Sequence, residues 1–368
     1  MRLPTYEELA SVEEQLEVLE YPLDQPLFVV GPPGSGKTVL ALQRAQMVAV
    51  GYGPVSIITY NRMLCRLLAL MTDIDEEEVQ SFTMHKFIWN DYKNRTKEEP
   101  PSYEHDNYTH NWPAMLTRLE QDVTERDQLH LVVDEGQDLP KGFFLYVSGH
   151  VSKAITVFAD DDQALNSQRT TLEQIKQATG LDEPIILSKN HRNTPEIARL
   201  AEHFHSGRLP AAEVSRASNG ELPRLLYLQG MEATANFVSN WSKARGGNNG
   251  VIVNRNATAE NLHLLISNQL PGTRVDIYTN QRKNEDQINI LSDGVTVLNK
   301  ASVKGQEFDA VFILELERFI PCYNDEGKRG MYMMCSRARD YLFLVHGKNP
   351  LNDDAIAALP GPNVLERS

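Results

Sequence analysis

Short apolar runs alternate with helix-length segments in the first half of the chain. Four runs that are bounded by turn residues are expected to form buried strands, at residues 27–30, 56–59, 129–133 and 154–158. Between them, residues 39–50 and 61–71 have the length and the apolar spacing of helices. Strand–helix alternation of this kind is typical of parallel sheets, so this half predicts a parallel sheet that is flanked by helices.

A second series of apolar runs begins near residue 185 and predicts a second sheet. Its strands are expected at residues 185–187, 225–228, 250–253, 274–278, 295–298, 310–314 and 341–345. The length of 368 residues suits two or three domains. We therefore expect an α/β protein with one domain at residues 1–184 and another at residues 185–368, and we find no internal sequence repeat.

Polar segments separate some of these runs. Residues 90–110 are polar and contain two consecutive prolines, which predicts a surface excursion. Residues 217–222 and 244–250 are expected to be loops. The polar tail that begins near residue 348 predicts one short closing helix.

The composition is that of a soluble globular protein. Hydrophobic residues make up 41% of the chain, and no apolar run approaches the roughly 18 residues that a membrane helix needs. The first residues are acidic where a secretory signal would be apolar, so export is not expected. Cys65, Cys322 and Cys335 are too widely spaced for a disulfide framework or a cysteine-based zinc site, and they fit a cytoplasmic location.

The charge balance limits how the chain can contact nucleic acid. Lys and Arg number 36 against 50 Asp and Glu, so the formal net charge is 36 − 50 = −14. Proteins that bind nucleic acid gain most of their affinity by neutralising phosphates. Because the average surface of this chain repels phosphates, any such contact must come from a local basic or polar groove, or from a partner.

A phosphate-binding loop follows the first predicted strand. The segment has the pattern G-x-x-x-x-G-K-[ST] between a strand and a helix, and it consists of Gly31, Pro32, Pro33, Gly34, Ser35, Gly36, Lys37 and Thr38. Its glycines let backbone N–H groups point at phosphate oxygens, and the helix dipole adds to the attraction. We expect Lys37 to reach the β- and γ-phosphates of ATP, Thr38 to ligate Mg²⁺, and Val39 to continue the site into the helix.

An acidic pair ends the strand predicted at residues 129–133. Alone, Asp134 and Glu135 are equally typical of a surface turn. Combined with the phosphate-binding loop, they predict hydrolysis, with Asp134 as a ligand of Mg²⁺ and Glu135 as the residue that orients or deprotonates the attacking water.

These two motifs resemble those of superfamily 1 helicases of the UvrD/Rep/PcrA type, and further motifs follow in the order of that family. The resemblance implies that Gln15 reads the adenine edge and that Gln163 senses the γ-phosphate. It also implies that two segments, residues 59–62 and 81–87, contact single-stranded DNA, with the contacts falling to Thr59, Tyr60, Asn61, Thr83 and His85.

Three motifs in the second half of the chain complete the resemblance. Residues 190–193 resemble a motif that stacks His191 on adenine and brings Arg192 to the γ-phosphate. Residues 302–309 resemble a motif in which Gly305 and Glu307 lie at the ribose, and residues 335–339 resemble a motif in which Arg337 is a second arginine finger. The family fold then implies two RecA-like P-loop NTPase domains in tandem, called 1A and 2A, with ATP in the cleft between them.

The chain also departs from the family pattern. It lacks large helical insertions and has only a small one at about residues 90–125, so it resembles a minimal two-domain core. His191 replaces a tyrosine, Gln306 replaces a leucine, and Ala301 stands where a histidine that contacts DNA is common. Trp89 and Trp112 suit either base stacking or burial, and burial is the favoured interpretation.

Two functions follow from this sequence. The first is an ATP-hydrolysing motor on single-stranded nucleic acid, DNA before RNA, within a repair or anti-phage defence assembly. The second is an ATP-dependent regulatory switch subunit that controls a protein partner such as a nuclease and unwinds little or no duplex itself. A small-molecule kinase has no use for the motifs of the second domain.

Overall fold

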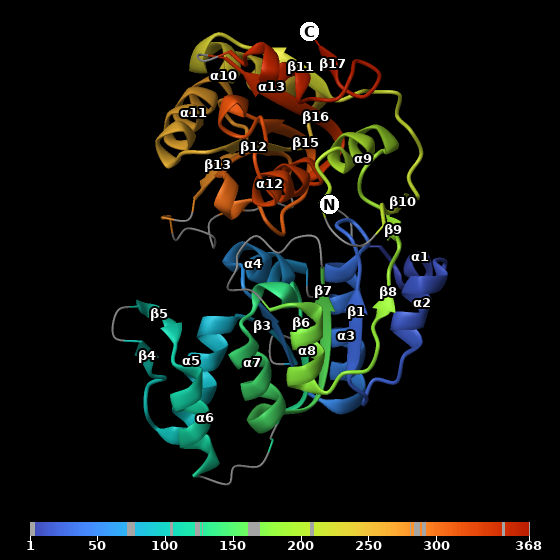
Figure 1. The fold of residues 1–368 in the computed structure, drawn as a ribbon, viewed down its shortest axis with the longest axis vertical. Coiled ribbons are helices and arrows are strands. Elements are labelled where there is room, and N and C mark those ends of the chain that lie inside the picture. Colours follow the sequence, from blue (N-terminus) through green and yellow to red (C-terminus); the bar gives the residue numbers. More distant parts are fainter. Residues whose placement is uncertain are drawn as a thin grey trace. The chain divides into compact units, whose positions relative to one another are not determined.

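The chain forms two compact units in the computed structural model, which describes residues 4–71, 78–103, 106–121, 126, 128–160, 170–206, 210–279, 281–282, 288, 292–347 and 350–367. The N-terminal unit is Arg2–Ser188, and the C-terminal unit begins at Lys189 (Figure 1). Each unit is an α/β structure built on a parallel sheet that is flanked by helices, a fold class that the sequence predicted and that is consistent with tandem RecA-like domains.

The N-terminal unit has a parallel sheet with the order β3-β2-β6-β7-β1-β8 among the described residues. Its strands are β1 (Leu27–Val30), β2 (Val55–Thr59), β3 (Val79–Thr83), β6 (Gln128–Val133), β7 (Ser152–Ala159) and β8 (Ile185–Ile186). Its helices are α1 (Tyr6–Ala10), α2 (Glu13–Glu20), α3 (Lys37–Tyr52), α4 (Arg62–Met71), α5 (Met84–Thr96), α6 (Trp112–Glu120), α7 (Lys141–Tyr146) and α8 (Leu172–Thr179). An antiparallel hairpin of β4 (Ser102–Tyr103) and β5 (Asp106–His110) follows α5.

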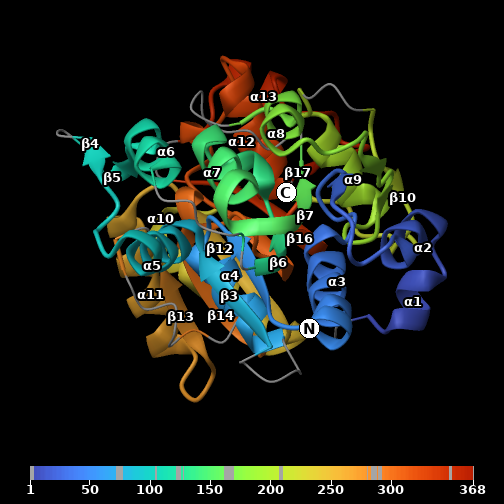
Figure 2. The ribbon, with the colours of Figure 1, turned by 90° about the horizontal axis from the view of Figure 1, so that it is seen from below.

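Helices cover both faces of this sheet. Figures 1 and 2 show α3 on one face and α7 and α8 on the other. Every residue of β1 and β2 is buried, as expected of parallel strands that are covered on both faces. Because β1 is wholly apolar and β2 is mostly so, both strands were easy to predict.

The C-terminal unit has a second parallel sheet, with the order β13-β14-β12-β15-β16-β11-β17 among the described residues. Its strands are β11 (Arg224–Tyr227), β12 (Asn248–Val253), β13 (Val275–Tyr278), β14 (Gly294–Asn299), β15 (Phe308–Ile313), β16 (Ala338–His346) and β17 (Glu366–Arg367), and β9 (Lys189–Asn190) pairs with β10 (Glu213–Val214) outside it. Its helices are α9 (Pro195–Glu202), α10 (Gly230–Arg245), α11 (Asn256–Gln269), α12 (Asp325–Cys335) and α13 (Asp353–Ala357), the last of which is the short closing helix that was predicted.

The two sheets share one strand order. Read from its β8 edge, the N-terminal sheet has the order β8-β1-β7-β6-β2-β3. Read from its β17 edge, the C-terminal sheet has the corresponding order β17-β11-β16-β15-β12-β14, followed by β13 as an additional edge strand. The turn after β6 and the turn after β15 also correspond, since Glu135 and Glu315 are both left-handed, with φ of 56° and 54°, and a 3₁₀ turn follows each. The units are therefore related in topology although the sequence shows no repeat.

Two sequence-based expectations are wrong. The segment 185–187 was assigned to the second sheet, but β8 pairs with β1 in the N-terminal sheet. The segment 244–250 was expected to be a loop, but α10 and β12 occupy most of it. Gly246 and Gly247 make the turn in two residues, with φ of 66° and 73°, and the buried Asn249 Nδ2 donates to both of their carbonyl oxygens at 3.0 Å.

Of two other polar segments, one is a loop as predicted and the other contains more regular structure than expected. Residues 217–222 form a loop. The segment 90–110 is built from the second half of α5 and the β4–β5 hairpin, so it has more regular structure than a surface excursion needs.

A buried arginine connects α3 to the strands beside it. The Arg44 guanidinium donates to the hydroxyl of Thr156 at 2.9 Å and to the carbonyl oxygens of Tyr21 at 2.9 Å and Pro22 at 2.8 Å. His130 on β6 lies 2.8 Å from the same hydroxyl through Nε2. Burial, with a smaller effect from the Arg44 charge, lowers the pKa of His130 to about 3.

This burial predicts a loss of stability in mild acid. The unfolded chain takes up a proton at His130 below about pH 6.5, and the folded chain resists it, so the contribution is complete above that pH and declines as the pH falls toward about 3. Between pH 7.5 and pH 5.0, urea unfolding of the wild type should lose about 2 kcal/mol more than His130→Gln loses. Equal losses in the two proteins would show that His130 is not held neutral.

Candidate functional site

The phosphate-binding loop is tightly built between β1 and α3. Gly34 and Gly36 have φ of 82° and 90°, in the region that favours glycine. A Cβ on Gly31 would lie 2.8 Å from both Leu187 Cβ and Ser35 Oγ, so no larger residue fits there without a shift. The Ser35 hydroxyl donates to the carbonyl oxygen of Pro32 at 2.8 Å and holds the curve of the loop.

Lys37 lies inside the loop that precedes it. Its ammonium donates to the carbonyl oxygens of Gly31 at 2.6 Å and Pro32 at 2.8 Å, and it lies 3.5 Å from a carboxylate oxygen of Asp160 at the end of β7. Lys37 is buried, and Asp160 is fully buried. The loop therefore holds one positive charge at the place where a phosphate-binding loop receives negative charge.

Thr38 and Asp134 form the candidate magnesium site. The Thr38 hydroxyl donates to Asp134 Oδ2 at 2.7 Å, and the backbone N–H of Glu135 donates to Asp134 Oδ1 at 2.9 Å. Burial, reinforced by the nearby Glu135 carboxylate, raises the pKa of Asp134 to about 7. One hydroxyl and one carboxylate suit Mg²⁺, which takes few protein ligands and completes its shell with phosphate oxygens and water. The residues therefore fit this ion.

Glu135 is held by a residue that the sequence analysis did not single out. Gln137 Nε2 donates to Glu135 Oε2 at 2.5 Å, and Gln137 Oε1 accepts from the backbone N–H of Asp160 at 2.9 Å. A Cβ on Gly136 would lie 2.7 Å from a methyl group of Val157, so glycine allows the turn to lie this close to the sheet. The spacing of an amide two residues after the acidic pair was the available signal for Gln137.

The remaining predicted residues of the N-terminal nucleotide site have mixed positions. Gln15 on α2 is buried and donates to the carbonyl oxygen of Ser35 at 3.0 Å, so it contacts the outer side of the phosphate-binding loop. Val39 is half-buried in the first turn of α3. Gln163 lies outside the described residues.

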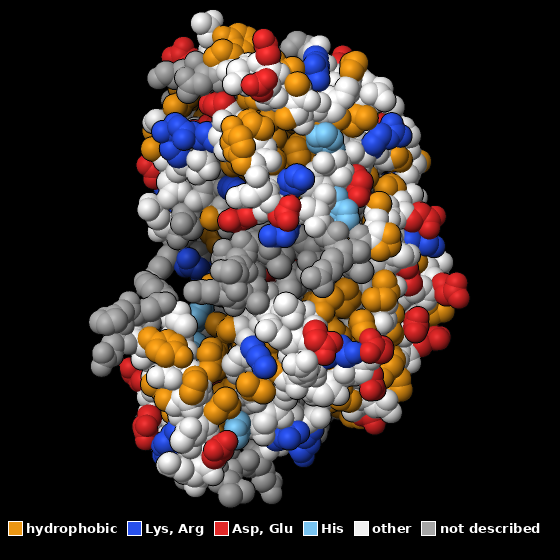
Figure 3. All heavy atoms as spheres, in the orientation of Figure 1, with side chains coloured by type: hydrophobic (Ala, Val, Ile, Leu, Met, Phe, Trp, Pro, Cys, Tyr) orange, Lys and Arg blue, Asp and Glu red, His pale blue; other side chains and the backbone are white. Residues whose placement is uncertain are grey.

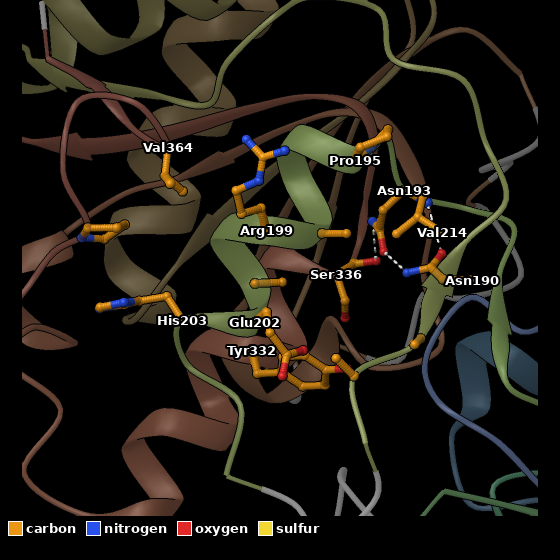
Figure 4. A pocket seen from close by; sticks show the side chains of 15 residues that line it. Asn190, Asn193, Pro195, Arg199, Glu202, His203, Val214, Tyr332, Ser336 and Val364 are labelled. Atoms are coloured by element: carbon orange, nitrogen blue, oxygen red, sulfur yellow. Dashed lines mark hydrogen bonds between the residues drawn. The ribbon is translucent and has the colours of Figure 1, made fainter.

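In the C-terminal unit, three predicted motifs come together. The Arg192 guanidinium forms an ion pair with Glu307 and donates to the carbonyl oxygen of Ser336 at 3.2 Å. Asn190 Nδ2 donates to Asn193 Oδ1 at 2.7 Å, and Asn193 Nδ2 donates to the same Ser336 oxygen at 3.2 Å (Figure 4). This network fixes the loop that carries Arg192 to the start of β16. It also forms one wall of a cavity of about 500 Å³.

Arg337 is buried beside this network. Its Nε donates to the carbonyl oxygen of Met333 at 3.0 Å, and its Nη1 donates to that of Gln306 at 3.5 Å. The other predicted residues of these motifs, Gly305 and His191, directly precede Gln306 and Arg192 in the chain. Gly305 has φ of 76°, and His191 Nδ1 lies 2.8 Å from the hydroxyl of Ser215.

The predicted nucleic-acid contacts gather at the carboxyl ends of β2 and β3. Thr59 and Thr83 are paired in the register of these two parallel strands. Tyr60 is 49% exposed, and its ring centroid lies 6.1 Å from that of His85. Asn61 and Thr83 also stabilise helix starts, because their side-chain oxygens accept hydrogen bonds from backbone N–H groups at the starts of α4 and α5.

The two tryptophans differ. Trp112 is buried, and a Cβ on Gly142 would lie 2.1 Å from its ring, so this ring packs directly against the backbone of α7. Trp89 is 41% exposed, so the interpretation of both tryptophans as buried is wrong for Trp89. Its position on the outer side of α5 depends on how that helix packs, which the sequence pattern alone did not determine.

Comparison with known proteins agrees with the geometry of the loop and the acidic pair. Residues 15–169 match a family model described as an AAA domain. The matched segment includes the phosphate-binding loop and the acidic pair.

The chain was also compared with solved structures and with curated proteins. It is similar to the solved C-terminal domain of a possible DNA helicase from Lactobacillus plantarum WCFS1, with 20% sequence identity and a TM-score of 0.35, over 48% of this chain and 98% of that one. No curated protein matches it. None of the helices in the described ranges is long and apolar enough to cross a membrane.

Proposed function

We propose that the protein is an ATP-hydrolysing motor of the superfamily 1 helicase type that acts on single-stranded nucleic acid, DNA before RNA. The observation that carries this proposal is the arrangement of Lys37, the Thr38–Asp134 pair and the Glu135–Gln137 pair around one loop. The similarity of residues 15–169 to a family model described as an AAA domain supports ATP as the substrate. The cytoplasm and a repair or anti-phage defence assembly remain our expected setting.

The residues of the N-terminal unit divide the chemistry among them. Lys37 neutralises charge on the β- and γ-phosphates, and the backbone of the loop positions them. Glu135 orients the attacking water and accepts its proton, while Gln137 keeps the carboxylate in place. Mg²⁺, held through Thr38 and Asp134, would supply charge neutralisation at the β- and γ-phosphates.

We assign the second half of the chemistry to the C-terminal unit. In this proposal Arg192 and Arg337 donate to the charge that develops on the transferred phosphoryl group, with His191 at the adenine and Gly305 and Glu307 at the ribose. In the structure Arg192 is paired with Glu307, so this ion pair must rearrange before both side chains reach ATP. Hydrolysis then depends on how the units close, which makes nucleotide state a source of relative motion.

Removal of Arg192 should separate catalysis from binding. Arg192→Ala is expected to lower kcat about 100-fold and to change the KM for ATP by only a few-fold, because the guanidinium acts mainly on transition-state charge. Steady-state ATPase kinetics measure both values. Arg199→Ala, an exposed arginine on α9 of the same unit, is the matched control and should hydrolyse ATP at the wild-type rate. Wild-type kcat in a folded Arg192→Ala protein would remove Arg192 from the site.

The polymer dependence of hydrolysis tests the motor itself. We expect single-stranded DNA to stimulate ATP hydrolysis, and we expect the stimulation to weaken as salt rises, because phosphate contacts release counterions. The measurement is the ATPase rate with single-stranded DNA, single-stranded RNA or no polymer, each at two salt concentrations. A rate that no polymer changes would contradict the motor.

The net charge of −14 favours one alternative, an ATP-dependent switch subunit that controls a protein partner such as a nuclease. On the face shown in Figure 3, acidic and basic side chains are interspersed among the described residues and form no large basic patch. A switch of this kind would respond to its partner in the same ATPase assay and not to a polymer.

A further inference from the structure

An exposed tryptophan on α5 is flanked by lysines. Trp89 is 41% exposed, and the Lys93 ammonium lies 4.3 Å from the centroid of its indole ring. Lys86 and Lys93 are both exposed. Figure 1 shows α5 at the outer side of the N-terminal unit, next to α6 and the β4–β5 hairpin.

The spacing on α5 turns these residues into one surface. Residues three or four positions apart share a face of a helix, so His85, Trp89 and Lys93 form a row, with Lys86 beside Trp89. The row covers about 12 Å along the helix axis, at 1.5 Å per residue. Tyr60 extends it at the start of α5, since its ring centroid lies 6.1 Å from that of His85. We call Tyr60, His85, Lys86, Trp89 and Lys93 the α5 face.

Asp91, the acidic residue of α5, is hydrogen-bonded within the N-terminal unit. Asp91 accepts hydrogen bonds from Tyr146 Oη at 2.6 Å and from Arg95 Nε at 2.9 Å. Arg95 and Tyr146 are well buried, so this carboxylate belongs to the packing of α5 against the unit. The described charges that α5 places on the α5 face are therefore those of Lys86 and Lys93. The positive charge that α5 places on this face is opposite in sign to the net charge of the whole chain.

Rings and cations in one row match a single-stranded polyanion with stacking bases. Proteins hold such strands by stacking bases on aromatic side chains and by pairing Lys or Arg with phosphates. Two members of the α5 face, Tyr60 and His85, are residues that the proposed function already assigns to nucleic-acid contact. An acidic peptide would use the lysines but would leave the indole and phenol rings without a partner.

We propose that the α5 face binds single-stranded nucleic acid, with Trp89 as a base-stacking platform and Lys86 and Lys93 as phosphate contacts. The inference rests on the proposed function and deepens it, because it extends the path of the strand beyond the ends of β2 and β3 and along α5. The Lys93 ammonium, now over the indole ring, exchanges that contact for a phosphate when a base stacks.

The tryptophans of the chain give a direct measurement. Of the three, Trp112 is buried, and Trp241 packs with its ring centroid 4.7 Å from that of Phe343. Trp89 is the exposed one, so a stacked base should quench its fluorescence selectively. Titration of the full chain with a 20-nucleotide oligo(dT) should give a saturable quench, and Trp89→Phe should lose most of that signal.

Affinity and its salt dependence test the two chemical roles separately. Trp89→Ala should weaken binding about tenfold, as expected for the loss of one stacked base. The double variant Lys86→Ala/Lys93→Ala should reduce the slope of log Kd against log salt by about 1.4, since each phosphate contact with a single strand contributes about 0.7. Tyr323→Ala changes an aromatic residue that is 91% exposed in the C-terminal unit, and it should bind like the wild type. Thermal melting verifies that each variant is folded.

The outcomes separate this inference from the function on which it rests. If the wild type binds oligo(dT) and the strand stimulates its ATPase, while folded Trp89→Ala and the double lysine variant bind unchanged, the α5 face is wrong and the motor stands. If the wild type neither binds the strand nor responds to it, both proposals fail. Quenching that Trp89→Phe retains would also overturn the stacking role of Trp89.

Discussion

Lys37→Ala is expected to reduce the rate of ATP hydrolysis about 1,000-fold, a loss at the upper end of what removal of one preorganised donor costs. The ammonium donates to the carbonyl oxygens of Gly31 and Pro32 inside a buried loop, and in our proposal it neutralises charge on the phosphates that bind there. Without it, the loop keeps its glycine geometry but lacks the charge that offsets a triphosphate. Single-turnover kinetics measure the loss of hydrolysis, and calorimetry measures the loss of ATP affinity.

A matched variant controls for the loss of a lysine in this unit. Lys141 is exposed at the start of α7, and Lys141→Ala should retain wild-type hydrolysis and stability. A folded Lys37→Ala protein that still hydrolyses ATP within tenfold of the wild-type rate would show that this loop is not the phosphate site.

Glu135→Gln should block the chemical step and leave ATP bound. Glutamine keeps the size of the side chain and an oxygen that can accept from Gln137 Nε2, but it cannot take a proton from water. We expect single-turnover hydrolysis to fall about 1,000-fold, within the range for loss of a general base, and the Kd for ATP to change by less than about threefold. A trapped ATP complex should be recoverable by rapid filtration.

A second substitution distinguishes the base from its support. Gln137→Leu removes the hydrogen bond to Glu135 without removing the carboxylate, so it should cost about tenfold, much less than Glu135→Gln. If Glu135→Gln turned over ATP rapidly, another group would have to activate the water.

Much of the fold was predictable because its central strands consist mainly of apolar residues. The described side chains of β1, β2, β6 and β7 are largely buried, and Gly31, Asp134 and Asp160 directly follow β1, β6 and β7. The strand β8 was assigned to the wrong sheet since a two-residue strand carries no signal about its partner. The segment 244–250 was predicted as a loop, but its polar Asn249 is buried in β12, where Nδ2 donates to carbonyl oxygens of a two-residue turn whose geometry the sequence did not reveal.

The candidate site was predictable where chemistry is local and not where it depends on packing. The loop from Gly31 to Thr38 is one continuous segment, and its strand–loop–helix setting was visible in the sequence. In contrast, the Arg192–Glu307 ion pair joins residues that are far apart in the chain. The exposure of Trp89 likewise depends on which side of α5 packs against the unit, since Asp91 is drawn inward by Arg95 and Tyr146.

The central claim is that both units act on one triphosphate, and a transition-state analogue tests it most directly. ADP with aluminium fluoride and Mg²⁺ mimics the transferred phosphoryl group, so its affinity reports the arginines that reach that group. For the folded double variant Arg192→Ala/Arg337→Ala, we predict that the Kd of this complex rises at least about 100-fold while the Kd of ADP alone stays within about threefold. Equal affinity of the variant and the wild type for the analogue would mean that the C-terminal arginines take no part in hydrolysis.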